Sequence, residues 1–212
     1  MLKFYMTPGS CSTGIHILLQ ELDLLFEVYP VNLMAGDNSS ETFRALNPKA
    51  TIPVLVNDDG RSISEFQAIA WWLARSFPKA ALLPDSIDDE VRALEMMDYV
   101  VGTLHGQGFT RIFTTDKYAL RSEDHGAVKQ QGRSIVDECF SVINGLLDDR
   151  DYVCTKFSIA DAALFYPEFW AVHSKIALPP NCAKHFSNMM QRPAVRQVLM
   201  EEGYNPDNLK PA

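Results

Sequence analysis

Cys11 is the residue of this chain whose type and position most clearly favour chemistry. It follows a short apolar segment, Leu2–Met6, and a Pro8-Gly9 break, and it precedes apolar residues at helical spacing. A cysteine in the first turn of a helix meets free backbone N–H groups and the positive end of the helix dipole, which lower a thiol pKa. We therefore predict a reactive thiol at Cys11. The alternative is a small buried cysteine that packs beneath the helix.

The residues around and beyond Cys11 narrow that chemistry. Residues 11–14 contain no second cysteine, so the segment is not a dithiol redox motif. Cys139, Cys154 and Cys182 lie far along the chain, within or beside helical patterns, and we expect them to be inert. A single activated thiol either forms a mixed disulfide with a small thiol or donates a hydrogen bond to a bound thiolate. Both alternatives predict a thiol-containing ligand.

Two further segments offer backbone groups to a ligand. Ile52 and Pro53 precede an apolar strand, where the backbone groups of Ile52 could pair with an extended peptide. Spacing alone favours an ordinary trans peptide at Pro53. Ser64 is expected to cap the next helix. The N–H groups of Glu65 and Phe66 then form an anion site beside a carboxylate that could hold an ammonium group.

The second half of the chain contributes one histidine and several aromatic residues. His105 borders an apolar helical stripe, so it is either a packing residue or, if it faces the cleft, a base or a hydrogen-bond donor to a ligand thiolate. Aromatic residues at helical spacings are Phe109, Phe113, Tyr166 and Trp170. We expect most of them to be core residues and one or two to line an apolar substrate pocket.

The elements that must position these residues alternate at first and then become helical. The first 80 residues predict a βαβ unit, followed by two strands joined by a turn at residues 57–60 and by a helix from residue 65 to about residue 76. Prolines interrupt the pattern between residues 77 and 84, and the pattern after residue 88 is helical. We predict an α/β domain over residues 1–79 and an all-α domain over residues 88–212.

Composition excludes several other classes of protein. The chain has 212 residues, 47% of them hydrophobic, which is enough for one large or two modest cores. A formal charge of −8 argues against nucleic acid as the main partner, because phosphate binding needs a basic face. No apolar run approaches the roughly 18 residues that span a bilayer, and no signal-like N-terminus is present, so we expect neither export nor a membrane partner. Four cysteines without framework spacing fit the cytoplasm.

Motifs along nearly the whole chain resemble those of bacterial beta-class glutathione S-transferases in order and spacing. They are residues 8–12, 47–48, 52–55, Glu65, His105, residues 157–162 and residues 192–195. The resemblance implies a thioredoxin-like N-terminal domain joined to an all-α C-terminal domain, a homodimer, and a cis peptide at Pro53. It implies a cytoplasmic detoxification enzyme that conjugates glutathione to small hydrophobic electrophiles without a metal. Thiol–disulfide exchange through Cys11 would be a second activity.

The same resemblance implies roles for individual residues. Cys11 would lie near the glutathione sulfur and share the catalytic work with His105. Ile52 would pair with the cysteinyl backbone of glutathione, and Glu65 would meet its γ-glutamyl group. Trp170 would stand with His105 on the second-domain side of the active site, where the other aromatic candidates would contact the electrophile.

One position departs from the family pattern. Phe66 stands where relatives usually have serine, so the hydroxyl that would bind the γ-glutamyl carboxylate is absent and only the backbone N–H remains. A hydrogen bond to a charged group contributes roughly 1.5–3 kcal/mol, so its loss would weaken glutathione binding. This departure keeps a second hypothesis open, a non-catalytic binding or interaction protein with the same fold.

Overall fold

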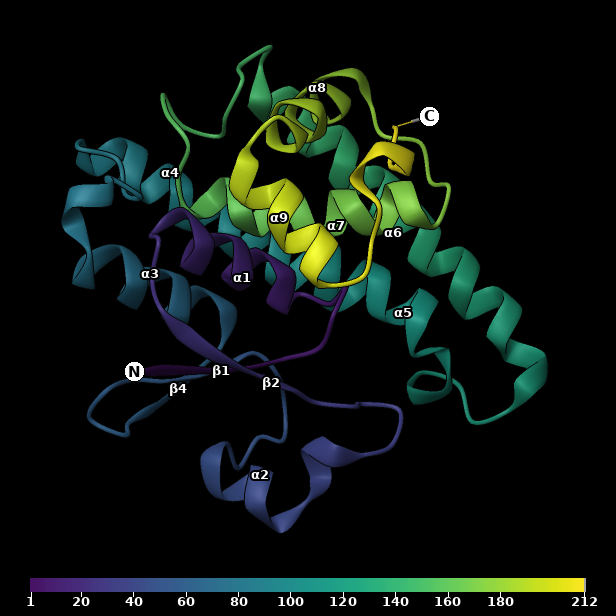
Figure 1. The fold of residues 1–212 in the computed structure, drawn as a ribbon. Coiled ribbons are helices and arrows are strands. Elements are labelled where there is room, and N and C mark those ends of the chain that lie inside the picture. Colours follow the sequence, from purple (N-terminus) through teal and green to yellow (C-terminus); the bar gives the residue numbers. More distant parts are fainter. Residues whose placement is uncertain (212) are drawn as a thin grey trace.

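A computed structural model of the chain describes residues 1–211. It contains a sheet part followed by a helical part (Figure 1). The sheet part comprises β1 (Leu2–Met6), α1 (Ser12–Glu21), β2 (Phe26–Pro30), α2 (Glu41–Leu46), β3 (Val54–Val56), β4 (Ser62–Ser64) and α3 (Phe66–Ser76). The helical part comprises α4 (Ile87–Asp98), the π-helix η3 (Tyr99–Phe109), α5 (Thr110–Phe113), α6 (His125–Leu147), α7 (Ile159–His173), α8 (Pro180–Met190) and α9 (Pro193–Glu201).

The sheet has the strand order β2-β1-β3-β4. β1 pairs with β2 in parallel, and β3 is antiparallel to β1 and β4. This topology confirms the predicted βαβ unit followed by ββα, the thioredoxin-like arrangement. Helices α1 and α3 cover the face of the sheet that looks toward the helical part, and α2 lies on the other side (Figure 1).

Helix α7 is the centre of the helical part. Its residues 159–171 are all buried, as expected of a mainly apolar helix that is surrounded by other helices. A capping box fixes its start: Ser158 and Asp161 exchange side-chain and backbone hydrogen bonds, as the sequence predicted. α1 packs against both α7 and α9, so the start of α1 lies where the two parts of the molecule meet.

Two local expectations are wrong. Ser64 does not cap α3: it ends β4, and the N-cap is Glu65, whose φ of 76° turns the chain between strand and helix. The helix that carries His105 is not a regular α-helix, because residues 99–109 form π-helical turns. Such turns change the direction of each side chain relative to a 3.6-residue repeat and are frequent at functional sites.

Two kinds of feature are absent from residues 1–211. None of the helices there combines the length and the apolar character needed to cross a bilayer. The same residues contain no group of three or more histidine, cysteine, aspartate or glutamate side chains placed to hold a metal ion.

Candidate active site

Cys11 is the N-cap of α1 and points toward the loop before β3. Its Sγ lies 3.8 Å from the carbonyl oxygen of Ile52, to which it donates a weak hydrogen bond. Burial raises the pKa of the Cys11 thiol to about 12; nearby backbone N–H groups counteract this in part, and the Glu65 carboxylate adds to the increase. The predicted lowering of this pKa is therefore wrong, because burial outweighs the helix N-terminus.

The loop that carries Cys11 is held by the C-terminal end of α9. One carboxylate oxygen of Glu202 accepts hydrogen bonds from the Gly9 N–H and the Thr13 hydroxyl, both at 2.7 Å. Its other oxygen lies 2.9 Å from Nδ1 of His16. Gly9 has a φ of 70°, and a Cβ there would lie 2.0 Å from the hydroxyl oxygen of Tyr204. Only glycine therefore fits this turn.

Ile52 and Pro53 are joined by a cis peptide bond, as the resemblance implied. The pairing of β3 with β1 begins at Val54, which lies opposite Tyr5. Ile52 therefore lies outside the sheet ladder. Its carbonyl faces the Cys11 thiol, in the position where an extended peptide could form backbone hydrogen bonds.

Glu65 lies at the start of α3 in a strained backbone conformation. Non-glycine residues with positive φ are uncommon and cluster at functional sites. Its exposed carboxylate is 2.5 Å from Nζ of Lys49. The first N–H groups of α3, beginning with that of Phe66, have no partner within the helix, so the anion site predicted beside the Glu65 carboxylate stays a prediction for this terminus.

The Phe66 side chain does not face this terminus. It is 3% exposed, and its ring centroid lies 5.5 Å from that of Tyr166 on α7. A Cβ on Gly14 would approach the Phe66 ring to 2.7 Å, so α1 also packs closely against it. Phe66 thus belongs to the contact between the two parts of the molecule, where a serine would leave a cavity.

His105 is partly buried beside α7. Its Nδ1 lies 3.2 Å from the Tyr166 hydroxyl, and its ring meets that of Trp170 edge to face at 4.9 Å. Burial lowers the pKa of His105 to about 4, which leaves the imidazole neutral at physiological pH. Trp170 donates from its indole N–H to the Gly9 carbonyl at 2.7 Å. The histidine and the Cys11 loop are thereby tied to the same side chain.

The four aromatic candidates are close together but differ in exposure. Phe109 and Tyr166 are fully buried, Trp170 is 9% exposed, and Phe113 is 50% exposed. Phe113 stacks on Phe109 and meets Trp170 edge to face, each at 5.5 Å. Of the four, Phe113 offers apolar surface to a ligand, and the others form the layer behind it.

Sequence reasoning missed the residues that support the site. Glu202 and Tyr204 lie more than 190 positions along the chain from the Cys11 loop that they contact. No local sequence pattern predicts contacts between such distant residues. Lys49 carried no motif of its own. The orientation of Phe66 did have a signal, because the buried residues Ile69, Ala70 and Leu73 follow it at helical spacing.

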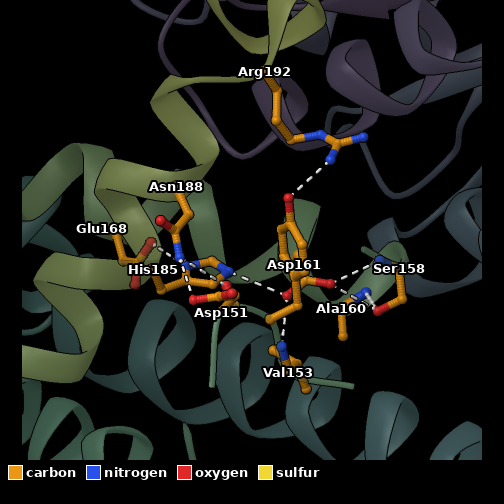
Figure 2. A network of polar contacts seen from close by, with 10 residues as sticks. Asp151, Val153, Ser158, Ala160, Asp161, Glu168, His185, Asn188 and Arg192 are labelled. Atoms are coloured by element: carbon orange, nitrogen blue, oxygen red, sulfur yellow. Dashed lines mark hydrogen bonds and ion pairs between the residues drawn. The ribbon is translucent and has the colours of Figure 1, made fainter. Parts of the chain in front are cut away.

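A second cluster of ionisable groups lies away from this site, between α7 and α8 (Figure 2). Nδ1 of His185 lies 2.8 Å from Glu168, and Nε2 lies 3.1 Å from Asp161; all three side chains are fully buried. Burial by itself lowers the pKa of His185, but the two carboxylates raise it to about 10. The two carboxylates thus favour the protonated form of the imidazole. Asp161 also accepts from the Val153 and Ser158 N–H groups, so this cluster anchors the start of α7.

The chain is similar to known proteins both in sequence and in fold. Residues 9–76 match the family described as Glutathione S-transferase, N-terminal domain. The chain is 33% identical over 208 residues to Glutathione S-transferase GstA of Escherichia coli O157:H7, which covers 95% of this chain and 99% of that protein.

Solved structures extend the similarity. A bacterial beta-class glutathione S-transferase of Sphingomonas chungbukensis matches with a TM-score of 0.80 and 27% identity, covering 95% of this chain and 98% of the other. A glutathione transferase homologue from Sulfitobacter, solved with bound glutathione, matches with a TM-score of 0.87 and 23% identity, covering 95% and 98%. The second similarity is one of fold.

Proposed function

The chain belongs to the glutathione S-transferase family, and from this premise we propose that it binds glutathione beside Cys11 and conjugates it to small hydrophobic electrophiles. The observation that carries the proposal is two uncharged hydrogen-bond donors linked through Trp170, whose ring meets His105 and whose indole N–H donates to the Gly9 carbonyl, two residues before Cys11. The Cys11 thiol keeps its proton because its pKa is raised to about 12, and His105 is neutral because its pKa is lowered to about 4. Such donors stabilise a ligand thiolate without a charge of their own.

Glutathione would lie beside Ile52, whose backbone is outside the sheet ladder. The backbone of Ile52 pairs with the cysteinyl residue in the manner of an added strand. The γ-glutamyl group lies at the start of α3, where N–H groups receive its carboxylate and Glu65 receives its ammonium group. Lys49, whose Nζ is 2.5 Å from the Glu65 carboxylate, is close enough to contact the γ-glutamyl carboxylate as well.

Catalysis then consists of lowering the pKa of the glutathione thiol and placing the electrophile. His105 and Cys11 donate hydrogen bonds to the glutathione sulfur, which favours its thiolate. That thiolate attacks the electrophile, a carbon–sulfur bond forms, and the leaving group departs with the electron pair. The exposed face of Phe113, backed by Phe109, Tyr166 and Trp170, is the surface we assign to the electrophile.

Several finer assignments belong to the same proposal. Residues 1–79 form the glutathione-binding domain and residues 88–212 the helical domain; the break between α3 and α4 supports this division. We assign a homodimer, a cytoplasmic location and a role in detoxification by analogy with the family. Thiol–disulfide exchange through Cys11 is a secondary activity and slow at neutral pH, since the thiol is protonated.

Two measurements on one preparation test the proposal. The protein should be retained on immobilised glutathione, be eluted by free glutathione, and accelerate conjugation of glutathione to chlorodinitrobenzene. Retention without conjugation would favour the alternative of a non-catalytic binding protein, and no retention would contradict both. The buried position of Phe66 weakens that alternative, because the side chain does not occupy the proposed glutathione site.

A further inference from the structure

The Tyr166 hydroxyl is a fully buried polar group at the centre of the candidate active site. The residue is 0% exposed on α7, and the only hydrogen-bond partner of its hydroxyl among residues 1–211 is Nδ1 of His105, at 3.2 Å. A phenol has one hydrogen to donate, and buried donors in folded proteins almost always find an acceptor. The direction of this hydrogen bond is therefore determined by what each group can do.

We propose that Tyr166 is a positioning residue, whose hydroxyl donates to Nδ1 of His105 and so keeps the imidazole proton on Nε2. The proposal rests on the proposed function, because it explains how His105 becomes a donor to the glutathione sulfur. In the other tautomer Nδ1–H would donate to the phenol oxygen, and the phenol hydrogen would have no acceptor. An unsatisfied buried donor disfavours that tautomer by roughly 5- to 150-fold.

The surroundings leave Nε2 free for this role. Among the described residues, Nε2 of His105 has no hydrogen-bond partner, whereas Nδ1 is engaged. The ring lies edge to face against Trp170 at 4.9 Å and against Tyr166 at 5.7 Å. A half-turn of the ring would replace Nδ1 by a carbon beside the Tyr166 hydroxyl and so break their hydrogen bond. Trp170 is bonded in turn to the Gly9 carbonyl in the Cys11 loop.

The tautomer matters because His105 does not change its charge in the working range of pH. With its pKa lowered to about 4, the imidazole is neutral above pH 5. The free nitrogen then donates to a thiolate only if it carries the proton. With the proton on Nδ1, the lone pair of Nε2 would face the thiolate and repel it.

The test compares Tyr166→Phe with Tyr152→Phe. Tyr166→Phe keeps the ring that packs on Phe66, His105 and Trp170 and removes only the hydroxyl. Tyr152→Phe is the matched control, because it removes a hydroxyl that bonds Arg192 away from the site. Nitrogen NMR of protein with labelled histidine, assigned with a His105→Gln variant, reads the tautomer without any glutathione present.

Wild-type protein and the Tyr152→Phe control should show a pyrrole-like Nε2 and a hydrogen-bonded, pyridine-like Nδ1 at His105. In Tyr166→Phe the Nδ1 resonance should move toward that of an unbonded nitrogen. A wild-type protein with the proton on Nδ1, or unchanged His105 resonances in Tyr166→Phe, would overturn the proposal.

Conjugation supplies the second readout. Tyr166→Phe should lower kcat about three- to tenfold with little change in the KM for glutathione, and raise the pKa of the bound glutathione thiol, followed by thiolate absorbance, by about 0.5–1 unit. An unchanged thiol pKa would overturn the role in catalysis. Failure of wild-type protein to bind glutathione would instead contradict the proposed function, and the NMR result would still decide the hydrogen bond.

Discussion

At the scale of single residues, burial determines the charge of both reactive groups. It disfavours the ionised form, so it raises the pKa of Cys11 to about 12 and lowers the pKa of His105 to about 4. A protonated thiol is a weak nucleophile, and a neutral imidazole is a weak acid. Both can nevertheless donate a hydrogen bond to a neighbouring anion. The site is therefore better suited to stabilise the thiolate of a ligand than to carry a thiolate of its own.

Alkylation of Cys11 tests this electrostatic state. Cys11 should react with iodoacetamide before the other cysteines, because it is partly exposed and they are buried. Its rate should be low at pH 7 and rise about tenfold per pH unit without levelling off below pH 10, since the thiolate fraction follows the raised pKa. Labelling followed by mass spectrometry measures both. A labelling rate that levels off above pH 8 would mean that the helix N-terminus, and not burial, determines the pKa of Cys11.

Substitution of Phe66 tests its structural role. Phe66→Ser should lower the free energy of unfolding by about 3–5 kcal/mol, because it removes a ring packed against Gly14 and Tyr166. Phe113→Ser is the control: its ring is 50% exposed, so the loss should be much smaller. Urea titrations of the two variants give the comparison. Equal losses, or tighter glutathione binding in a stable Phe66→Ser protein, would return position 66 to the ligand site.

At the scale of elements, the end of α9 fixes the start of α1. Glu202→Ala should destabilise the protein by about 3 kcal/mol or more and weaken glutathione binding, because it leaves the Gly9 N–H and the Thr13 hydroxyl without their acceptor. The exposed Glu123, which pairs with Arg121 on the surface, provides the control, and Glu123→Ala should change stability by less than about 1 kcal/mol. Thermal unfolding and calorimetric titration would reveal the difference; similar stability of the two variants would contradict this account of the loop.

The contact between α7 and α8 should make stability depend on pH. His185 has a folded pKa of about 10, above its ordinary value near 6.5, so its protonation stabilises the fold fully below pH 6.5 and progressively less as the pH rises toward 10. The groups that face it are Asp161 and Glu168, with Cys182 beside Glu168.

Urea unfolding between pH 6.5 and 8, below the range where most thiols ionise, measures this dependence. Wild-type stability should fall with pH, and His185→Gln should show a smaller slope because the titrating group is gone. Glu168→Gln, which keeps the histidine but removes one of its two partners, should give an intermediate slope. Parallel slopes in all three proteins would show that His185 does not hold an extra proton in the folded state.

At the scale of the whole molecule, the sequence predicted the order of elements well. Period-two and period-3.6 patterns are local, so the βαβ unit, the following ββα unit and the helical second part were recognisable. α2 was missed because it has only six residues, Glu41–Leu46, with one buried side chain among them. The π-helical turns at residues 99–109 are not predictable in this way, because their apolar residues also fit the spacing of an α-helical repeat.

Some proximities among the candidate site residues were predictable from the sequence, whereas the pKa shifts of those residues were not. Cys11, Ile52 and Glu65 do come together, as do His105 and Trp170. The sign of the Cys11 pKa shift was not predictable from the local helix signal, because it depends on burial by segments remote in the chain. Glu202 contacts the Cys11 loop, and Tyr166 forms a hydrogen bond with His105. Both contacts join segments that are distant in the chain, and a single sequence gives no information on such pairs.

In the proposed mechanism, neutral donors at this site, His105 above all, activate the thiol of glutathione. Steady-state conjugation of glutathione to chlorodinitrobenzene by His105→Ala tests it most directly, with His125→Ala as a control at a histidine that bonds the Ala119 carbonyl elsewhere. His105→Ala should lower kcat/KM about 10²-fold, and His125→Ala should change it little. Unchanged conjugation by His105→Ala would contradict this mechanism and leave His105 as a packing residue of the helical domain.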